Sequence, residues 1–266
     1  MKVIDLCRNL KLPESAAEIA AGTLSQEEEY QELKHQYQNE HQLFYERILK
    51  SAHPEQTFLS FCCRLACETY EMYKRKGIDE QVFWDTFQDI RIWCEECFQE
   101  TGSYGIAEYQ WFWRLFEMKL FRLGRLEYEI AGAEEKIEGN GIIIERGEAV
   151  ISIHIPRGEP LEWEACEDSL QKAYQWFGRG RKYICHSWLL YPGLKEVLTP
   201  DSNIIRFQER FLLAGVDYRE REAEKRIFGW IAGNITAYQE NSTLQKNARN
   251  YLLSGRALGN GWGILK

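Results

Sequence analysis

The chain of 266 residues is 44% hydrophobic and 14% aromatic and contains only six prolines, which argues against long disorder and allows a substantial core. Its 41 acidic and 33 basic residues give a formal net charge of −8, so free DNA or RNA is not an expected main partner, because binding a polyphosphate needs a basic face. The sequence shows no leader-like apolar stretch and no membrane-spanning apolar run, so we expect a cytoplasmic protein without membrane association. Its eight cysteines are accordingly expected to be free thiols.

Helical periodicity dominates the sequence up to about residue 120. Apolar residues follow helical spacing in residues 26–50, in a run that opens at "HPEQ" and stops at "KRKGID", and in a run that ends at "ETGSYG". Gly77 is expected just beyond the end of the second run, and Asp79 at the N-cap of the third. "IAEYQWFWRLFEMKLF" is apolar over a wide arc and is expected to form a fourth helix. We therefore predict a helical N-terminal domain over residues 1–120.

The periodicity changes after residue 120. "RLEYEIA", "GIIIER" and "AVISIHI" are short β-rich segments, and a helix over residues 162–177 follows them. Beyond that helix we expect strands in "RKYICHSWLL" and "NIIRFQERFLL", a short helix in "YPGLKEVL", a helix in "TLQKNARNYLL" and an edge strand in "GNGWGIL". The expected fold class is α+β, with the helical domain packed on a mixed α/β domain over residues 121–266.

The stretch "AVISIHIPRGEPL" at residues 149–161 combines a strand, a glycine turn and a helix start. Backbone N–H groups and the positive end of a helix dipole favour an anion at such a place, and Arg157 and Gly158 suit a phosphate contact. Glu159, Glu162 and Glu164 crowd the same helix start and would repel an anion. Local chemistry alone thus leaves two interpretations open, a phosphate site and a plain turn.

The order of elements in residues 121–266 resembles the GNAT-like acyltransferases. The segments "FRLGRLEYEI", "IHIPRGEPL", "CHSWLL" and "PDSNIIRFQERF" are more closely similar to a group of bacterial acyltransferase-domain proteins that couple a helical N-terminal domain to a GNAT-like C-terminal domain. This resemblance implies a mixed sheet whose fourth and fifth strands are parallel. It also implies acetyl-coenzyme A or another acyl-coenzyme A as cofactor, with its pyrophosphate near Ile155, Arg157 and Gly158.

Candidate catalytic residues lie near the ends of the two strands that the resemblance makes parallel neighbours. His154 is near the end of one and His186 near the end of the next, and ligands of α/β sheets gather at such carboxyl ends. Transfer to an amine needs a base for the amine proton, which suits either histidine, and an acid for the leaving thiolate. Ser187 and Tyr191 are the candidates for that donor, and structural hydrogen bonds are the competing interpretation for all four residues.

Two hypotheses of function follow. The first is an acyl-coenzyme A-dependent N-acyltransferase acting by direct transfer, with a peptide amine, aminoglycoside, polyamine or small metabolite as acceptor. The second is a catalytically inactive GNAT-like module that senses a ligand or binds a protein. It is motivated by the acidic residues beside the anion site and by a missing second glycine: the superfamily pattern is Arg or Gln, two residues, Gly, one residue, then Gly or Ala, whereas Arg157 and Gly158 are adjacent here and no second glycine follows at that spacing. The acyl chain length and the oligomeric state stay open.

The segment "IWCEEC" imitates a redox motif. A dithiol of the thioredoxin type lies at a helix start, where the dipole lowers the thiol pKa, whereas Cys94 and Cys97 fall late in a helical run and on its apolar stripe. We therefore expect core cysteines there. No paired ligand spacing in the sequence supports a metal site, and we expect no metal.

Overall fold

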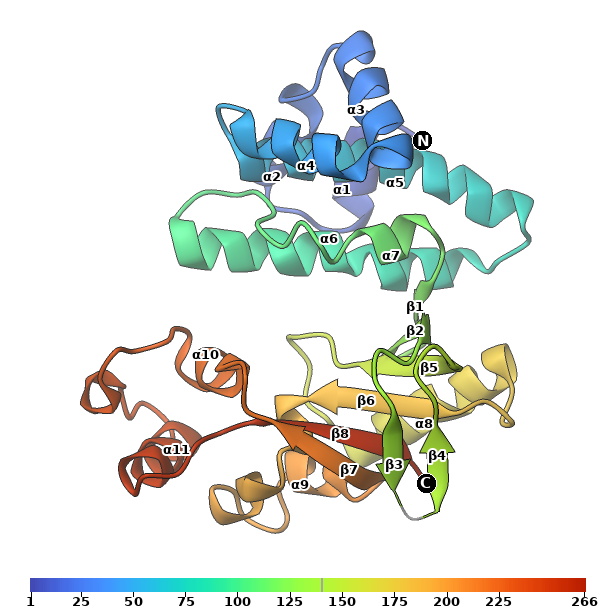
Figure 1. The fold of residues 1–266 in the computed structure, drawn as a ribbon. Coiled ribbons are helices and arrows are strands. Elements are labelled where there is room, and N and C mark those ends of the chain that lie inside the picture. The colour runs from blue at the N-terminus through green and yellow to red at the C-terminus, as the bar shows by residue number, and fades with distance from the viewer. Residues whose placement is uncertain (140) are drawn as a thin grey trace. The chain divides into compact units, whose positions relative to one another are not determined.

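The computed structural model describes residues 1–139 and 141–266. The chain divides into two compact units, Met1–Arg122 (unit 1) and Leu123–Lys266 (unit 2), and we describe each by itself (Figure 1). Within the described residues, no helix combines the length and apolar character needed to cross a membrane. Helices and a mixed sheet make up the fold, which confirms the α+β class.

Unit 1 is helical, as the sequence predicts. Its elements are α1 (Val3–Asn9), α2 (Glu14–Gly22), α3 (Glu27–Asn39), α4 (His41–Lys50), α5 (Pro54–Arg75), α6 (Glu80–Thr101), α7 (Trp113–Phe116) and the short strand β1 (Leu120–Arg122). The periodic run of residues 26–50 is two helices, because the chain leaves the helical conformation at Glu40 (φ −142°, ψ 58°). Gly77 follows α5 with φ +68°, and the Asp79 side chain accepts from the Gln81 amide at 2.8 Å, which confirms both expected helix boundaries.

The expected fourth helix is mostly wrong. Only α7 is α-helical within "IAEYQWFWRLFEMKLF", and β1 already begins at Leu120. At the start of this segment the Ile106 amide donates to the Glu55 carbonyl of α5 at 2.9 Å, so the chain is bonded to another helix instead of to itself. At its end Met118 has φ +55°, a left-handed conformation that no α-helix continues.

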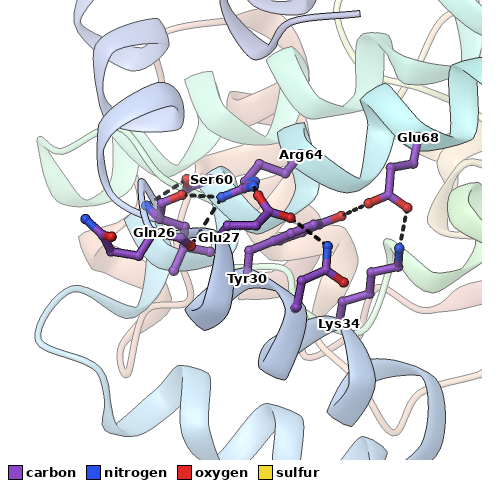
Figure 2. A network of polar contacts seen from close by, with 9 residues as sticks. Gln26, Glu27, Tyr30, Lys34, Ser60, Arg64 and Glu68 are labelled. Carbon is purple, nitrogen blue, oxygen red and sulfur yellow. Dashed lines mark hydrogen bonds and ion pairs between the residues drawn. The ribbon is translucent and has the colours of Figure 1, made fainter.

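A polar network joins α3 to α5 (Figure 2). The Tyr30 hydroxyl donates to Glu68 Oε1 at 2.7 Å, and Lys34 Nζ donates to the other oxygen of the same carboxylate at 2.5 Å. Arg64 of α5 lies 4.1 Å from the centre of the Tyr30 ring and pairs with Glu27. The network links the two helices at both ends of the Tyr30 side chain.

Unit 2 is built on a sheet with the strand order β2-β5-β6-β8-β7 (Figure 1). Its strands are β2 (Glu127–Gly132), β5 (Ala149–His154), β6 (Tyr183–Ser187), β7 (Phe211–Asp217) and β8 (Asn260–Leu265). Strands β5 and β6 are parallel, as expected, and the other neighbours are antiparallel. Strands β3 (Ile137–Gly139) and β4 (Ile142–Ile144) pair as a separate two-stranded sheet. The remaining elements are α8 (Trp163–Phe177), η1 (Trp188–Leu190), η2 (Pro192–Glu196), α9 (Asn203–Gln208), α10 (Glu222–Phe228), η3 (Ile235–Ala237) and α11 (Thr243–Leu253).

The two faces of this sheet carry different layers. On one face the Tyr183 hydroxyl donates to the Ala173 carbonyl of α8 at 3.2 Å. On the other face Ile184 and Ile264 pack with Ile137 and Ile144 of the β3–β4 pair. We call these the α8 face and the hairpin face. Because side chains alternate along a strand, every second residue of β5, β6 and β8 points to the hairpin face.

Two expectations for the last third of the chain are wrong. "NIIRFQ" is the helix α9 instead of a strand, because the Ser202 hydroxyl caps it by accepting from the Ile204 amide at 3.3 Å. "GNGWGIL" forms β8, which is not an edge strand but lies between β6 and β7 and pairs with both. Glycine lowers intrinsic strand propensity, yet here it permits close packing: a Cβ on Gly261 would lie 2.3 Å from the Leu190 carbonyl oxygen.

We expect Gly261→Ala to lower the stability of unit 2 by about 1–3 kcal/mol, because the new methyl group meets backbone atoms that cannot rotate away. Gly180→Ala is the matched control, since a Cβ there has no heavy atom within 4 Å among the described residues. Thermal melting of both variants measures the difference. Equal melting temperatures for the two variants would show that β8 does not need a glycine at this position.

Candidate active site

The two parallel strands part at their carboxyl ends. They pair at Ile151–Tyr183 and Ser152–Ile184. Strand β5 then continues to His154 and β6 to Ser187, and no further pair joins them among the described residues. In this stretch β6 pairs only with β8 on its other side. The parting lies at the carboxyl ends of two parallel strands, the sheet edge where α/β proteins hold their ligands.

A buried arginine holds the loop that leads from β5 to α8. Arg125 is only 5% exposed, and its guanidinium donates to the carbonyls of Pro156 (3.0 Å), Glu159 (2.6 Å) and Pro160 (3.0 Å). In a trans peptide the C=O and the following N–H point in opposite directions, so the amides of Arg157 and Leu161 face away from this guanidinium. Arg125 thereby turns loop N–H groups outward.

The start of α8 combines buried arginines with glutamates, and one of these arginines, Arg210, is ion-paired with Glu167 at 2.7 Å. The N-cap residue Glu162 makes no side-chain capping bond, so its carboxylate does not occupy the first N–H groups of the helix. Arg210, 7% exposed, donates to the Trp163 carbonyl at 2.9 Å and lies 3.5 Å from the centre of the Trp163 ring. Burial raises the pKa of the Cys166 thiol, whereas the charges of Arg125 and Arg210 act to lower it. Two buried cations and a helix dipole thus act on one helical turn.

The predicted cofactor contacts lie in this loop. Ile155 is half-buried, and Arg157 and Gly158 are exposed in a turn where Gly158 has φ +102°. A Cβ on Gly158 would meet no heavy atom within 4 Å among the described residues, so the chain is open to solvent there. The left-handed φ requires glycine at this position whatever the loop binds. Arg157 and Gly158 stay predicted phosphate contacts.

Both predicted histidines point to the hairpin face. Continuing the parallel register beyond Ser152–Ile184 places His154 and His186 at matching positions on either side of the parted strands. His154 Nε2 lies 2.9 Å from Oε2 of the buried Glu129 on β2. The His186 ring stacks on Trp262 of β8 with ring centres 3.8 Å apart and planes at 6°. The structure therefore brings the two histidines to one face and gives each a different partner.

His186 is exposed at the sheet edge, but one face of its ring is covered by Trp262, and desolvation lowers its pKa below its ordinary value of 6.5. The carboxylates of Glu222, Asp217, Glu220 and Glu134 act in the opposite direction but do not outweigh it. His186 is therefore neutral at pH 7 and is able to accept a proton.

The two predicted proton donors are placed apart from the histidines. Ser187 follows His186 in β6 and so points to the α8 face. Its oxygen accepts from the Leu189 amide at 3.2 Å, which leaves its own proton to donate. Tyr191 is 5% exposed, and its hydroxyl lies 2.9 Å from both the Tyr251 hydroxyl and the Ala257 carbonyl. Its hydrogen-bonding capacity is thus used within the core of unit 2.

The cysteines of "IWCEEC" are buried as free thiols in the C-terminal part of α6. Burial raises the pKa of Cys97, and it raises the pKa of Cys94 to about 12, so neither thiol is activated. Within residues 1–139 and 141–266, no group of three or more His, Cys, Asp or Glu side chains is arranged to hold a metal ion.

Comparison with known protein families agrees with these two units. Residues 1–118 match the family described as N-acyltransferase N-terminal domain, and residues 120–265 match the GNAT-like C-terminal domain. The chain belongs to the N-acyltransferases with a GNAT-like C-terminal domain. The sequence resemblance is thereby confirmed. Among proteins of curated function, none matches the chain of this N-acyltransferase.

Solved structures of acyltransferases share the fold. An acyltransferase in complex with decanoyl-CoA and teicoplanin is 21% identical over 98% of this chain and 86% of that chain, with a TM-score of 0.78. An acyltransferase mutant with octanoyl-CoA and an acyltransferase with CoA and 10C-Teicoplanin each have a TM-score of 0.79, at the same identity and coverage. At this identity the likeness establishes the fold of this N-acyltransferase.

Proposed function

We propose that this protein transfers an acyl group from an acyl-coenzyme A to an amine. The observation that carries the proposal is the parting of β5 and β6 next to a loop held by the buried Arg125 and a helix start without a side-chain cap. The membership of both units in N-acyltransferase domain families supports it, as do the acyl-CoA ligands of the similar structures. The coenzyme A pyrophosphate lies at the amides of residues 155–161 and the first turn of α8, with Arg157 as a charged contact. The thioester lies between the parted strands.

The reaction is a direct acyl transfer. The amine nitrogen attacks the thioester carbonyl, its C–N bond forms and the C–S bond breaks, and the coenzyme A thiolate leaves. His186 takes the proton that the amine nitrogen loses, because it is neutral at pH 7 and lies beside the gap. Ser187 donates a proton to the leaving thiolate from the α8 face. His154 lines the gap from β5, with Glu129 holding its ring.

The choice between the candidate residues follows from their contacts. Tyr191 is the weaker donor because its hydroxyl already donates to the Ala257 carbonyl. His154 is not our candidate for the base, because its Nε2 is already engaged by Glu129. The two residues that carry proton transfer thus lie on opposite faces of the sheet. This arrangement lets the amine approach from the hairpin face while the thiolate leaves toward the α8 face.

A titration of the purified protein with acyl-coenzyme A tests the proposal. We expect octanoyl-CoA, decanoyl-CoA, acetyl-CoA and free coenzyme A to raise the melting temperature, since a ligand at about 100 times its dissociation constant stabilises a fold by roughly 2.7 kcal/mol. ATP is the control, because it carries phosphates and adenine but no pantetheine arm. No shift with any coenzyme A species at millimolar concentration would refute acyl-coenzyme A binding, and an equal shift with ATP would reduce the site to a general nucleotide site.

A further inference from the structure

The hairpin face of the sheet contains a cavity of about 380 Å³ beside the histidine stack. Strand β7 and the segment leading into β3 form its sides, with Gly215 and Asp217 on one side and Glu135 and Ile137 on the other. Trp262 of β8 also lines it. The cavity belongs wholly to unit 2 and lies on the same face as His154 and His186.

Trp262 separates this cavity from His186. Its neighbours across the sheet are His186 on β6 and Gly215 on β7. His186 covers one face of the indole by stacking, whereas glycine offers no side chain to cover the other. A β-bulge between Leu213 and Gly215 creates this arrangement, because the extra residue Ala214 would otherwise stand opposite Trp262. Trp262 packs against the Ile137–Ile144 cluster and, where Gly215 leaves its β7 side uncovered by a cross-strand side chain, it lines the cavity.

Carboxylates dominate the electrostatics around the stack. The charges that act on His186 are those of Glu222, Asp217, Glu220 and Glu134, and all four are acidic. The two basic residues of the cavity wall are held by acidic neighbours: Lys136 Nζ lies 3.3 Å from Glu138, and Arg219 binds Asp217 at 2.7 Å. The exposed Glu135 lies 3.8 Å from the same Arg219, so the cavity wall carries three carboxylates, Glu135, Glu138 and Asp217, against two cations. The local field therefore favours a cation.

We propose that this cavity binds the acceptor, and that the acceptor is a cationic amine whose ring lies on the Trp262 indole where it lines the cavity. The indole of Trp262 attracts both the positive charge and the ring of the acceptor, and the surrounding carboxylates favour binding of the ammonium form. The ammonium group then reaches past Trp262 to His186 and loses one proton to solvent, which exposes the nitrogen lone pair; His186 takes the second proton as the C–N bond forms. This inference rests on the proposed function for the direction of transfer, but the binding that it predicts occurs without acyl-coenzyme A.

Fluorine NMR on the full chain tests the inference. The protein is labelled with 5-fluorotryptophan, and the Trp262 resonance is assigned from its loss in Trp262→Phe. Benzylamine is the probe, and benzyl alcohol is the matched probe with the same ring and no charge. We expect benzylamine to shift the Trp262 resonance saturably, and benzyl alcohol to bind about tenfold more weakly. No shift of Trp262 with benzylamine, or equal affinity for the two probes, would overturn the inference.

Two substitutions sharpen this test. Gly215→Val puts a side chain into the cavity without straining the backbone and is expected to abolish the shift, whereas Gly233→Val, a matched control at an exposed glycine, is expected to retain it. Glu135→Gln removes an exposed rim charge and is expected to weaken benzylamine binding two- to threefold, which provides a test if Gly215→Val fails to fold. Binding that survives in folded Gly215→Val would place the probe elsewhere.

Acyl-coenzyme A titrations on the same samples separate this inference from the proposed function. We expect Gly215→Val to bind octanoyl-CoA with the wild-type dissociation constant and to show a raised KM for the amine. If octanoyl-CoA fails to bind wild-type protein while benzylamine still shifts Trp262, the proposed function is wrong and the cation site stands. The reverse result would refute the acceptor site alone.

Discussion

His186→Phe is expected to lower kcat/KM for acyl transfer by about 10²–10⁴-fold, the typical contribution of a general base. Phenylalanine keeps an aromatic ring against Trp262 but has no nitrogen to accept the proton. The loss is therefore assigned to chemistry and not to a collapsed stack. The rate of thiol release from octanoyl-CoA with a saturating amine measures it. The dissociation constant of octanoyl-CoA is expected to stay at the wild-type value.

The pH profile distinguishes His186 from His154. Only the neutral imidazole accepts a proton, and because desolvation lowers the pKa of His186, its neutral form persists below pH 6.5. Wild-type kcat/KM is thus expected to decline on acidification only below that pH, and His186→Phe should lack this acidic limb. His154→Phe, which breaks the contact with Glu129, is the matched variant and should keep it. If the decline of kcat/KM at acidic pH disappeared in His154→Phe and persisted in His186→Phe, the general base would be His154 and not His186.

Arg125→Met is expected to weaken both the fold and acyl-coenzyme A binding. It leaves three loop carbonyls without their charged donor, for which we expect a loss of about 2–4 kcal/mol in the free energy of unfolding. It also releases the loop whose amides we assign to the pyrophosphate, so the dissociation constant of octanoyl-CoA should rise about tenfold or more. Thermal melting and calorimetric titration measure the two effects.

Arg125→Lys is the control for charge. Lysine keeps the positive charge near α8 but cannot reach three carbonyls as a planar guanidinium does, so it should recover only part of both losses. Full recovery of octanoyl-CoA binding in Arg125→Lys would show that charge alone matters and that the loop geometry does not. Wild-type binding in Arg125→Met would remove the loop from the site.

Sequence patterns predicted correctly those elements whose conformation depends on residues close together in the sequence. The Asp79 cap, the Gly77 helix end, and the helices α8 and α11 follow from capping residues and periodicity, and the structure contains each of them. The wrong predictions concern elements whose conformation depends on residues far away in the sequence. The Ile106 amide is bonded to the Glu55 carbonyl of α5 at the start of a run whose own composition favours helix. The central place of β8 depends on Leu190 packing against Gly261, which no pattern within "GNGWGIL" reveals.

The candidate site shows the same division. Strand ends and a glycine turn locate His154, His186 and Gly158 in the sequence, because each follows from a short segment. Arg125 was missed because it precedes a strand in "LGRLEYE", far from the loop that it holds, and nothing in its neighbourhood marks it as buried. The Trp262 stack was missed for a related reason, since only the pairing of β8 with β6 brings that residue to His186.

The position of β8 has a consequence for how the protein is made. Strand β7 pairs with β8, and β8 alone connects it to the rest of the sheet. Ile184 of β6 pairs with Ile264 of β8, which is synthesised 80 residues later. During synthesis the edges of β6 and β7 are therefore unpaired for several seconds before β8, which pairs with both, leaves the ribosome. During that interval unpaired strand edges are open to other chains. The nascent protein is therefore most exposed to misassembly just before Leu265 emerges, and a chaperone that covers β6 in that interval would raise the yield of folded protein.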